Sequence, residues 1–316
     1  METLRQPRRS IRSSFAIEHK GKRLEHLTRR SFLKLAGIAV LAHQLPGVHL
    51  PLDDAPELDF VYGRALTTVD VYAQPDRSAP QTASLWQHSV TPIHDRAGGW
   101  YRVDLGWIER RSVQPILSLP TYSAPVAAPP FLAEVAGASA AIRAWCGADA
   151  PLKTTLGHGA VLRVVDRLQI DELDWYGVAG DDGALAGWTQ AAAWSPVTPP
   201  DFGVSGGWLH VNSRTHTLEA AYGGRTVLRA PVALGDGVTP GQYHVRRKEA
   251  CQACTADGGV RGIPWQTGLD GGITLSGAYW HNDFGATIPG NSLEVPPPVA
   301  KWLYGWLADG ANIICS

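Results

Sequence analysis

Glycine and proline residues divide this chain into short apolar runs, and this pattern constrains the fold more than any other feature. The 316 residues include 34 Gly and 23 Pro. Short apolar runs bounded by turn residues are typical of β-strands joined by tight turns. Hydrophobic residues make up 44% of the chain, so it can bury a sizeable core. We therefore predict a mostly β protein, with two or three domains as the expectation for this length.

The charge balance excludes one class of partner. The chain has 28 Lys and Arg residues against 29 Asp and Glu residues, a formal net charge of −1. A nucleic-acid-binding protein usually carries a basic patch or stripe, and here basic residues gather only near the N-terminus. We expect no nucleic-acid partner.

The N-terminal residues 1–34 are rich in Arg and Lys and precede a short apolar run over 35–42. A charged segment followed by a short apolar one is typical of an export signal. The segment resembles a twin-arginine (Tat) leader, which a translocase reads as an address for folded cargo. The residues that match the Tat pattern are Arg29, Arg30, Phe32 and Leu33. We predict a leader over 1–50 and an exported protein of the bacterial cell envelope; the alternative is a basic tail with a chance Arg pair.

The apolar run is far shorter than the roughly 18 residues that span a bilayer, so we expect no permanent membrane anchor. The Tat translocase is then a partner only during export.

Two central segments repeat one pattern of aromatic, glycine and proline residues. The first closes with Trp100-Tyr101, Gly106-Trp107 and Pro115, and the second with Trp175-Tyr176, Gly187-Trp188 and Pro196. Both resemble bacterial SH3-like domains, which implies two small barrels, over 57–117 and 135–198. The aromatic pairs either pack in the barrel cores or line a groove for glycan or peptide.

A Pro/Ala/Ser-rich stretch between the repeats predicts a linker over 118–134. The Ala-rich residues that follow, 132–145, suggest one helix.

The last third of the chain contains a series of motifs in a distinctive order. Thr239-Pro240-Gly241 is followed by Gly262-Ile263-Pro264-Trp265, then by Tyr279-Trp280-His281-Asn282-Asp283-Phe284-Gly285, and finally by Ala300-Lys301-Trp302-Leu303-Tyr304. Residues 199–316 thereby resemble the L,D-transpeptidase (YkuD-like) catalytic domain. The resemblance implies a β-rich fold and acyl transfer between peptidoglycan stem peptides.

The positions that would carry this chemistry hold different residues. The family uses a Cys in a Ser-His-Gly-Cys-x-Asn motif, with an upstream His as its base, because an imidazole raises the thiolate fraction of a nearby thiol. In this chain Ser276 occupies the base position and Ser292 the nucleophile position. Gly290 replaces the His of the motif, and Glu294 replaces its Asn.

These replacements leave three hypotheses. We favour a non-catalytic relative that keeps the groove and binds peptidoglycan stem peptides, glycan or an envelope partner. The second hypothesis is an acyl transferase or hydrolase that uses Ser292 with His281 as base, although the family keeps a His at that position that is not its base. The third is an interaction protein that binds through its barrels. The residues predicted to line the groove are Ser276, Gly277, Tyr279, Trp280, Gly290, Asn291 and Ser292.

The four cysteines do not match a metal or redox site. Cys251 and Cys254 lack the second pair that a structural zinc site needs, and no βαβ pattern supports a thioredoxin-like motif. We expect a disulfide between these two, or two bridges from them to Cys146 and Cys315. We predict no metal and no cofactor.

Overall fold

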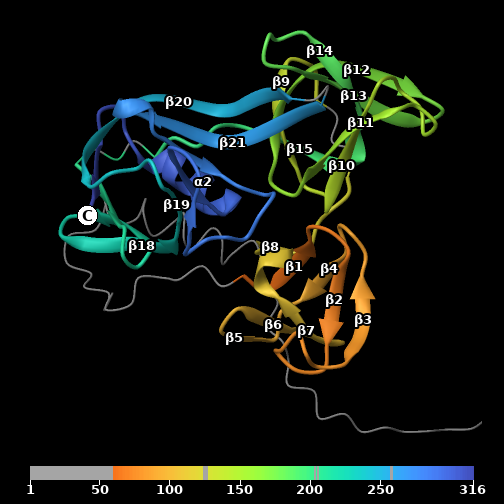
Figure 1. Ribbon diagram of the computed structural model, residues 1–316. Helices are drawn as coiled ribbons and strands as arrows, with labels where there is room; N and C mark the ends of the chain where they lie inside the picture. Colours follow the sequence, from red (N-terminus) through yellow and green to blue (C-terminus); the bar gives the residue numbers. More distant parts are fainter. Residues whose placement is uncertain (1–59, 124–126, 203, 205, 257–258) are drawn as a thin grey trace, which may run out of the picture. The chain divides into compact units, whose positions relative to one another are not determined.

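The computed structural model describes residues 60–123, 127–202, 204, 206–256 and 259–316 (Figure 1). The predicted leader, including Arg29, Arg30, Phe32 and Leu33, lies outside these residues. No helix within them is long and apolar enough to cross a membrane. The described residues form twenty-five strands, labelled β1 to β25, and one α-helix, α2 (Pro297–Trp306). The prediction of a mostly β protein is confirmed.

The first segment, residues 60–116, forms two small sheets around one apolar core. The sheets have the strand orders β4-β1-β8 and β3-β2-β7-β6-β5. Val71, Ile108 and Val113 are fully buried between them, because alternate residues of each strand point inward. The bounds are β1 (Tyr62–Ala65), β2 (Val69–Tyr72), β3 (Gln81–Leu85), β4 (Val90–Pro92), β5 (Asp95–Ala97), β6 (Trp100–Val103), β7 (Gly106–Glu109) and β8 (Val113–Ile116), with a 3-10 turn at Arg110–Ser112.

The second segment, residues 131–197, forms a seven-stranded antiparallel sheet in the order β11-β10-β14-β13-β12-β9-β15. Tyr176 and Trp194 are completely buried in its core. The bounds are β9 (Phe131–Val135), β10 (Ser139–Arg143), β11 (Leu152–Gly157), β12 (Val161–Ile170), β13 (Leu173–Ala179), β14 (Leu185–Gln190) and β15 (Trp194–Val197), with a 3-10 turn at Ala191–Ala193.

The helix predicted over 132–145 is wrong. That stretch holds β9 and β10, and β9 begins inside the predicted linker. Ala133 and Ala140 are buried in the sheet core, where a small side chain allows close packing. Tertiary packing has overridden the helical preference of alanine here.

The C-terminal domain, from β16 onward, is built on a ten-stranded sheet in the order β18-β17-β16-β25-β20-β21-β22-β24-β19-β23. Helix α2 packs on β21 and β22, and Leu303 of the helix is fully buried in the domain core. The bounds are β16 (Trp208–Asn212), β17 (Thr217–Tyr222), β18 (Arg225–Pro231), β19 (Ala233–Gly235), β20 (Gly241–Ala256), β21 (Gly259–Leu269), β22 (Thr274–Gly277), β23 (Thr287–Ile288), β24 (Ser292–Val295) and β25 (Asn312–Cys315), with a 3-10 turn at Asp270–Gly272.

The structure does not support the predicted disulfides. Cys146 and Cys315 are free thiols, and burial raises the pKa of Cys315 to about 11. The backbones of Cys251 and Cys254 both belong to β20. A strand rises about 3.3 Å per residue, so their Cα atoms lie roughly 10 Å apart, beyond the ~7 Å reach of a disulfide.

Candidate functional site

The two positions that resemble the family's catalytic ones lie on neighbouring strands. β22 and β24 are parallel, and their register sets Ser276 beside Glu294. Leu275 and Leu293, one residue earlier on each strand, are fully buried in the domain core. Because side chains alternate along a strand, Ser276 and Glu294 point to the opposite face. Ser292, two residues before Glu294, shares that face.

The Glu294 carboxylate joins the Ser292 hydroxyl and the His281 imidazole. The Ser292 hydroxyl donates a hydrogen bond to Glu294 Oε1 over 3.2 Å, and His281 Nε2 lies 2.5 Å from Glu294 Oε2. Only about 15% of the Glu294 side chain and 16% of the His281 side chain are exposed. Glu294 therefore separates the hydroxyl from the imidazole.

The backbone fixes which nitrogen of His281 carries the proton. The N–H of Asp283 donates to His281 Nδ1 over 3.0 Å. A backbone N–H can only donate, so Nδ1 must be the unprotonated nitrogen. Nε2 then carries the hydrogen and donates it to Glu294. Both nitrogens of His281 are therefore occupied, and it is not placed to take a proton from Ser292.

Glycines allow the chain to close around Ser292. A Cβ on Gly235 would lie 2.2 Å from the Gly290 carbonyl oxygen, so only glycine fits there. Gly237 N donates to that carbonyl over 2.9 Å, and Gly290 N donates to Asp236 Oδ1 over 2.9 Å. Gly290 has φ +100°, a conformation that favours glycine. The motif position where the family has a His is thus a backbone turn in this chain.

The other predicted groove residues divide into two groups. Gly290 and Asn291 are exposed beside Ser292, whereas Ser276 and Gly277 are buried. Tyr279 is also buried and packs into the core of the second segment, where burial raises its pKa to about 12. Its ring lies against Trp280, with ring centroids 5.1 Å apart. Tyr279 is therefore a packing residue in this structure.

The sequence reasoning missed the role of Glu294. By sequence alone, Glu294 is only a replacement for the Asn of the family's motif. The available signal was its spacing from Ser292, because residues two apart on a strand share a face.

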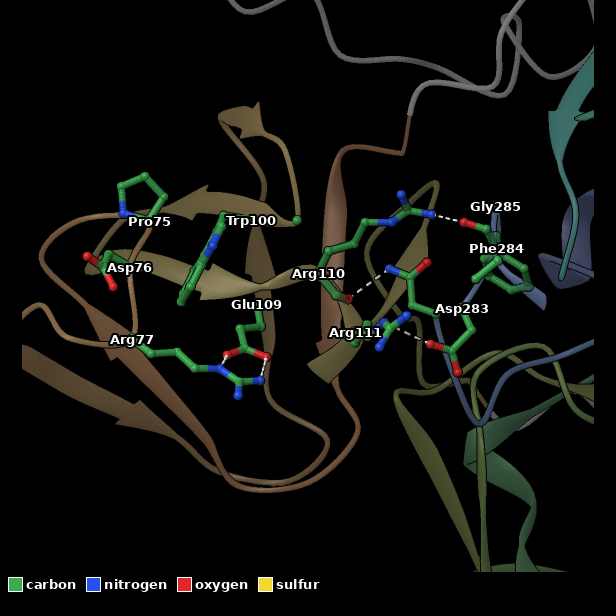
Figure 2. Close-up of a pocket in the computed structure, with 13 residues that line it drawn as sticks. Pro75, Asp76, Arg77, Trp100, Glu109, Arg110, Arg111, Asp283, Phe284 and Gly285 are labelled. Carbon is green, nitrogen blue, oxygen red and sulfur yellow. Dashed lines mark hydrogen bonds and ion pairs between the residues drawn. The ribbon is translucent and has the colours of Figure 1, made fainter. Parts of the chain in front are cut away.

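The loop that carries His281, residues 278–286, also forms one wall of an open groove of about 670 Å³. Figure 2 shows Arg110 and Arg111 of the first segment pointing at this loop, while Arg77 turns back to Glu109 of its own segment. The groove does not include Ser292.

Within the residues that the structure describes, no three His, Cys, Asp or Glu side chains gather as a metal site would require.

Comparison with known proteins gives matches among solved structures alone. No family model and no curated protein matches the chain. A mutant of the Enterococcus faecium L,D-transpeptidase has 17% identity and a TM-score of 0.30, over 36% of this chain and 50% of that one. An L,D-transpeptidase from Stackebrandtia nassauensis has 19% identity and a TM-score of 0.30, over 35% and 56%.

An L,D-transpeptidase from Mycobacterium smegmatis has 13% identity and a TM-score of 0.32, over 47% of this chain and 93% of that one. The chain spans about half the length of the first of these structures. Similarity at this level does not establish the family or the activity of the chain.

Proposed function

We propose that this chain is an exported protein of the bacterial cell envelope that binds peptidoglycan stem peptides without transferring them. The binding site is the face of β22 and β24 that carries Ser276, Ser292 and Glu294. The proposal is based on the sequence motifs that resemble L,D-transpeptidases and on the geometry of this face.

The observation that carries the proposal is the bonding of His281. A serine hydroxyl is a poor nucleophile unless a base and an oxyanion site are aligned with it. Both nitrogens of His281 are already engaged, by Glu294 and by Asp283. The site therefore has neither the thiol nor the imidazole base that the resemblance implies for catalysis.

Sedimentation with purified peptidoglycan sacculi tests the binding. We expect the full chain to co-sediment, and Ser292→Tyr, which places a large ring on the proposed binding face, to weaken binding about tenfold or more, equivalent to ~1.4 kcal/mol. Thr226→Tyr, on the edge strand β18 of the same sheet, is the matched control. No co-sedimentation would overturn the proposal. Equal binding by Ser292→Tyr would instead favour the hypothesis that the two barrels bind the wall.

A second candidate function is supported by the hydrogen bond from Ser292 to Glu294. In this version the Ser292 oxygen attacks the amide carbonyl of a stem peptide and its proton passes to Glu294. The leaving amine takes that proton, and water or an amine then resolves the ester. A carboxylate is a weaker base than an imidazole, which is why this function ranks second. Labelling of Ser292 by a fluorophosphonate probe, lost in Glu294→Gln, would establish it.

Export by the Tat route is part of the proposal. It is based on Arg29, Arg30, Phe32 and Leu33. Replacing both arginines by lysine should keep the protein in the cytoplasmic fraction of a bacterial host, and unchanged export would exclude this route.

A further inference from the structure

Several polar contacts join the first segment to the His281 loop. Arg64 Nη2 donates to Tyr279 O over 2.8 Å, and Asn282 Nδ2 donates to Arg110 O over 2.9 Å. Arg111 Nε lies 3.2 Å from Asp283 Oδ1, and Arg110 Nη2 donates to Phe284 O. These contacts involve residues on both sides of His281 in the sequence, and Figure 2 shows those made by the Arg110 and Arg111 side chains.

Arg64 is an unusual anchor because it is almost completely buried, at 2% exposed. Besides Tyr279 O, its guanidinium donates to Gln114 Oε1 over 2.6 Å and to His88 Nδ1 over 2.7 Å. Burial lowers its pKa to about 10, so it is still charged at neutral pH. Burying a charge is costly. The Arg64 guanidinium has three acceptors, two in the first segment and one in the His281 loop, so it joins these two parts of the chain.

We propose that the first segment, residues 60–116, is a built-in clamp that positions His281. Arg64, Arg110 and Arg111 hold the His281 loop so that the Asp283 N–H meets His281 Nδ1. That contact keeps the hydrogen on Nε2, and Nε2–H holds the Glu294 carboxylate beside Ser292. The three arginines are positioning residues, since they act on the site only through the loop.

Asp283 links the arginines of the first segment to His281. Its carboxylate pairs with Arg111, while its backbone N–H sets the protonation of His281. Arg111 is mostly exposed, at 73% of its side chain, and faces the groove. A change at Arg111, on the surface of the first segment, is thus three contacts away from Glu294. The inference deepens the proposed function, because it names the element that orders the binding face.

The test compares the full-length double variant Arg110→Ala/Arg111→Ala with Arg77→Ala. Arg77 lines the same groove, but its carboxylate partner, Glu109, belongs to its own segment. We expect amide exchange over 279–286 to speed up about tenfold or more in the double variant, as expected for the loss of charge-assisted bonds. We expect no change over 279–286 in the control.

A second readout separates positioning from general destabilisation. Long-range ¹H–¹⁵N spectra of His281 should show a single Nε2–H tautomer in the wild type and a mixture of tautomers in the double variant. With Arg110 unchanged, Arg111→Lys keeps the ion pair with Asp283. It should therefore change the exchange and the tautomer much less than Arg111→Ala does. Arg111→Ala alone, at an exposed site, provides the same comparison if the double variant fails to fold.

An unchanged tautomer and unchanged exchange in these variants would overturn the clamp. Both readouts are made without ligand, so they are independent of the proposed function. If the tautomer shifts as expected but the wild type does not bind sacculi, the clamp stands and the binding proposal fails.

Discussion

The first and second segments share a sequence pattern, but they contact the C-terminal domain in different ways. The first segment holds the His281 loop with arginine side chains and one backbone carbonyl. The second segment shares apolar cores with the domain: Val161 of β12 is buried in the domain core, and Tyr279 of the domain is buried in the core of the second segment. One ion pair, between Lys301 and Glu134 at 2.5 Å, accompanies this packing.

This difference shows that a repeated pattern can specify a fold without specifying an interface. The tryptophan, tyrosine and glycine residues of each repeat mostly serve their own sheet: Tyr101, Trp175 and Tyr176 are buried. Residues outside the pattern, such as Arg64 and Val161, contact the domain, and from the pattern the Tyr101 hydroxyl accepts a hydrogen bond from Asn282 Nδ2 over 3.4 Å. Apolar burial contributes mainly stability, whereas hydrogen bonds to charged groups fix geometry. Mutations on the two sides should therefore have different effects.

The largest effect should come from the apolar side. Tyr279→Ala removes a ring that is 6% exposed and leaves a cavity where the domain meets the second segment. We expect the free energy of unfolding in urea to fall by about 3–5 kcal/mol, as for other buried aromatic residues. Tyr222→Ala, at a residue that is 39% exposed, is the control. A loss below ~1 kcal/mol would mean that the second segment is not joined to the domain by a common core.

The next largest effect should come from Glu294, which the first segment is inferred to hold in place through His281. Glu294→Ala leaves His281 Nε2–H and the Ser292 hydroxyl without their shared acceptor. We expect a loss of about 1–3 kcal/mol in the free energy of unfolding. Glu249→Ala, at an exposed carboxylate 3.4 Å from Arg247, should have little effect.

A double-mutant cycle sharpens this test. In the Arg110→Ala/Arg111→Ala background, the loss caused by Glu294→Ala should shrink, because His281 is then less well placed. Strictly additive losses would mean that the arginines and Glu294 act independently.

An acid-induced loss of stability should come from one histidine in each segment. Burial lowers the pKa of His158, and burial together with Arg64 lowers the pKa of His88. Between these lowered values and the ordinary value of about 6.5, the unfolded chain binds more protons than the folded one. Stability is therefore complete above about pH 6.5 and falls as the pH drops below it.

Each histidine can contribute at most about 1.4 kcal/mol per pH unit. His158→Asn should reduce the slope of unfolding free energy against pH between pH 7 and 5, measured in urea. His94→Asn, at an exposed histidine paired with Asp104, is the control. An unchanged slope in His158→Asn would show that His158 does not contribute to the loss of stability in acid.

The smallest effect should be the stability change of Arg111→Ala. The pair with Asp283 is largely exposed, so its loss should cost less than ~1 kcal/mol and should depend on salt. If the change were as large as that of Tyr279→Ala, the contrast between a polar clamp and an apolar core would fail.

Much of the fold could be predicted from the sequence, because its determinants are local. The spacing of Gly and Pro residues indicates short strands, and the described residues form them. The helix predicted for the Ala-rich stretch is wrong because the helical preference of alanine is weak. The packing of Ala133 and Ala140 in a sheet core outweighs that preference.

For the candidate site, the family resemblance singled out Ser292 and His281, and the strand spacing could have added Glu294. The contacts of Arg110 and Arg111 with the His281 loop span more than 170 residues of sequence. No local pattern contains such contacts, since they depend on how distant segments meet.

The central claim is that the site has no imidazole placed to activate residue 292. The most direct test is the intact mass of the purified protein after incubation with a carbapenem, which acylates an activated nucleophile. The account predicts no added mass on the wild type. The variant Ser276→His/Ser292→Cys, which restores the family's base and nucleophile and keeps Gly290 at its positive φ, should gain the adduct and so prove the assay. A stable adduct on Ser292 of the wild type would contradict the account.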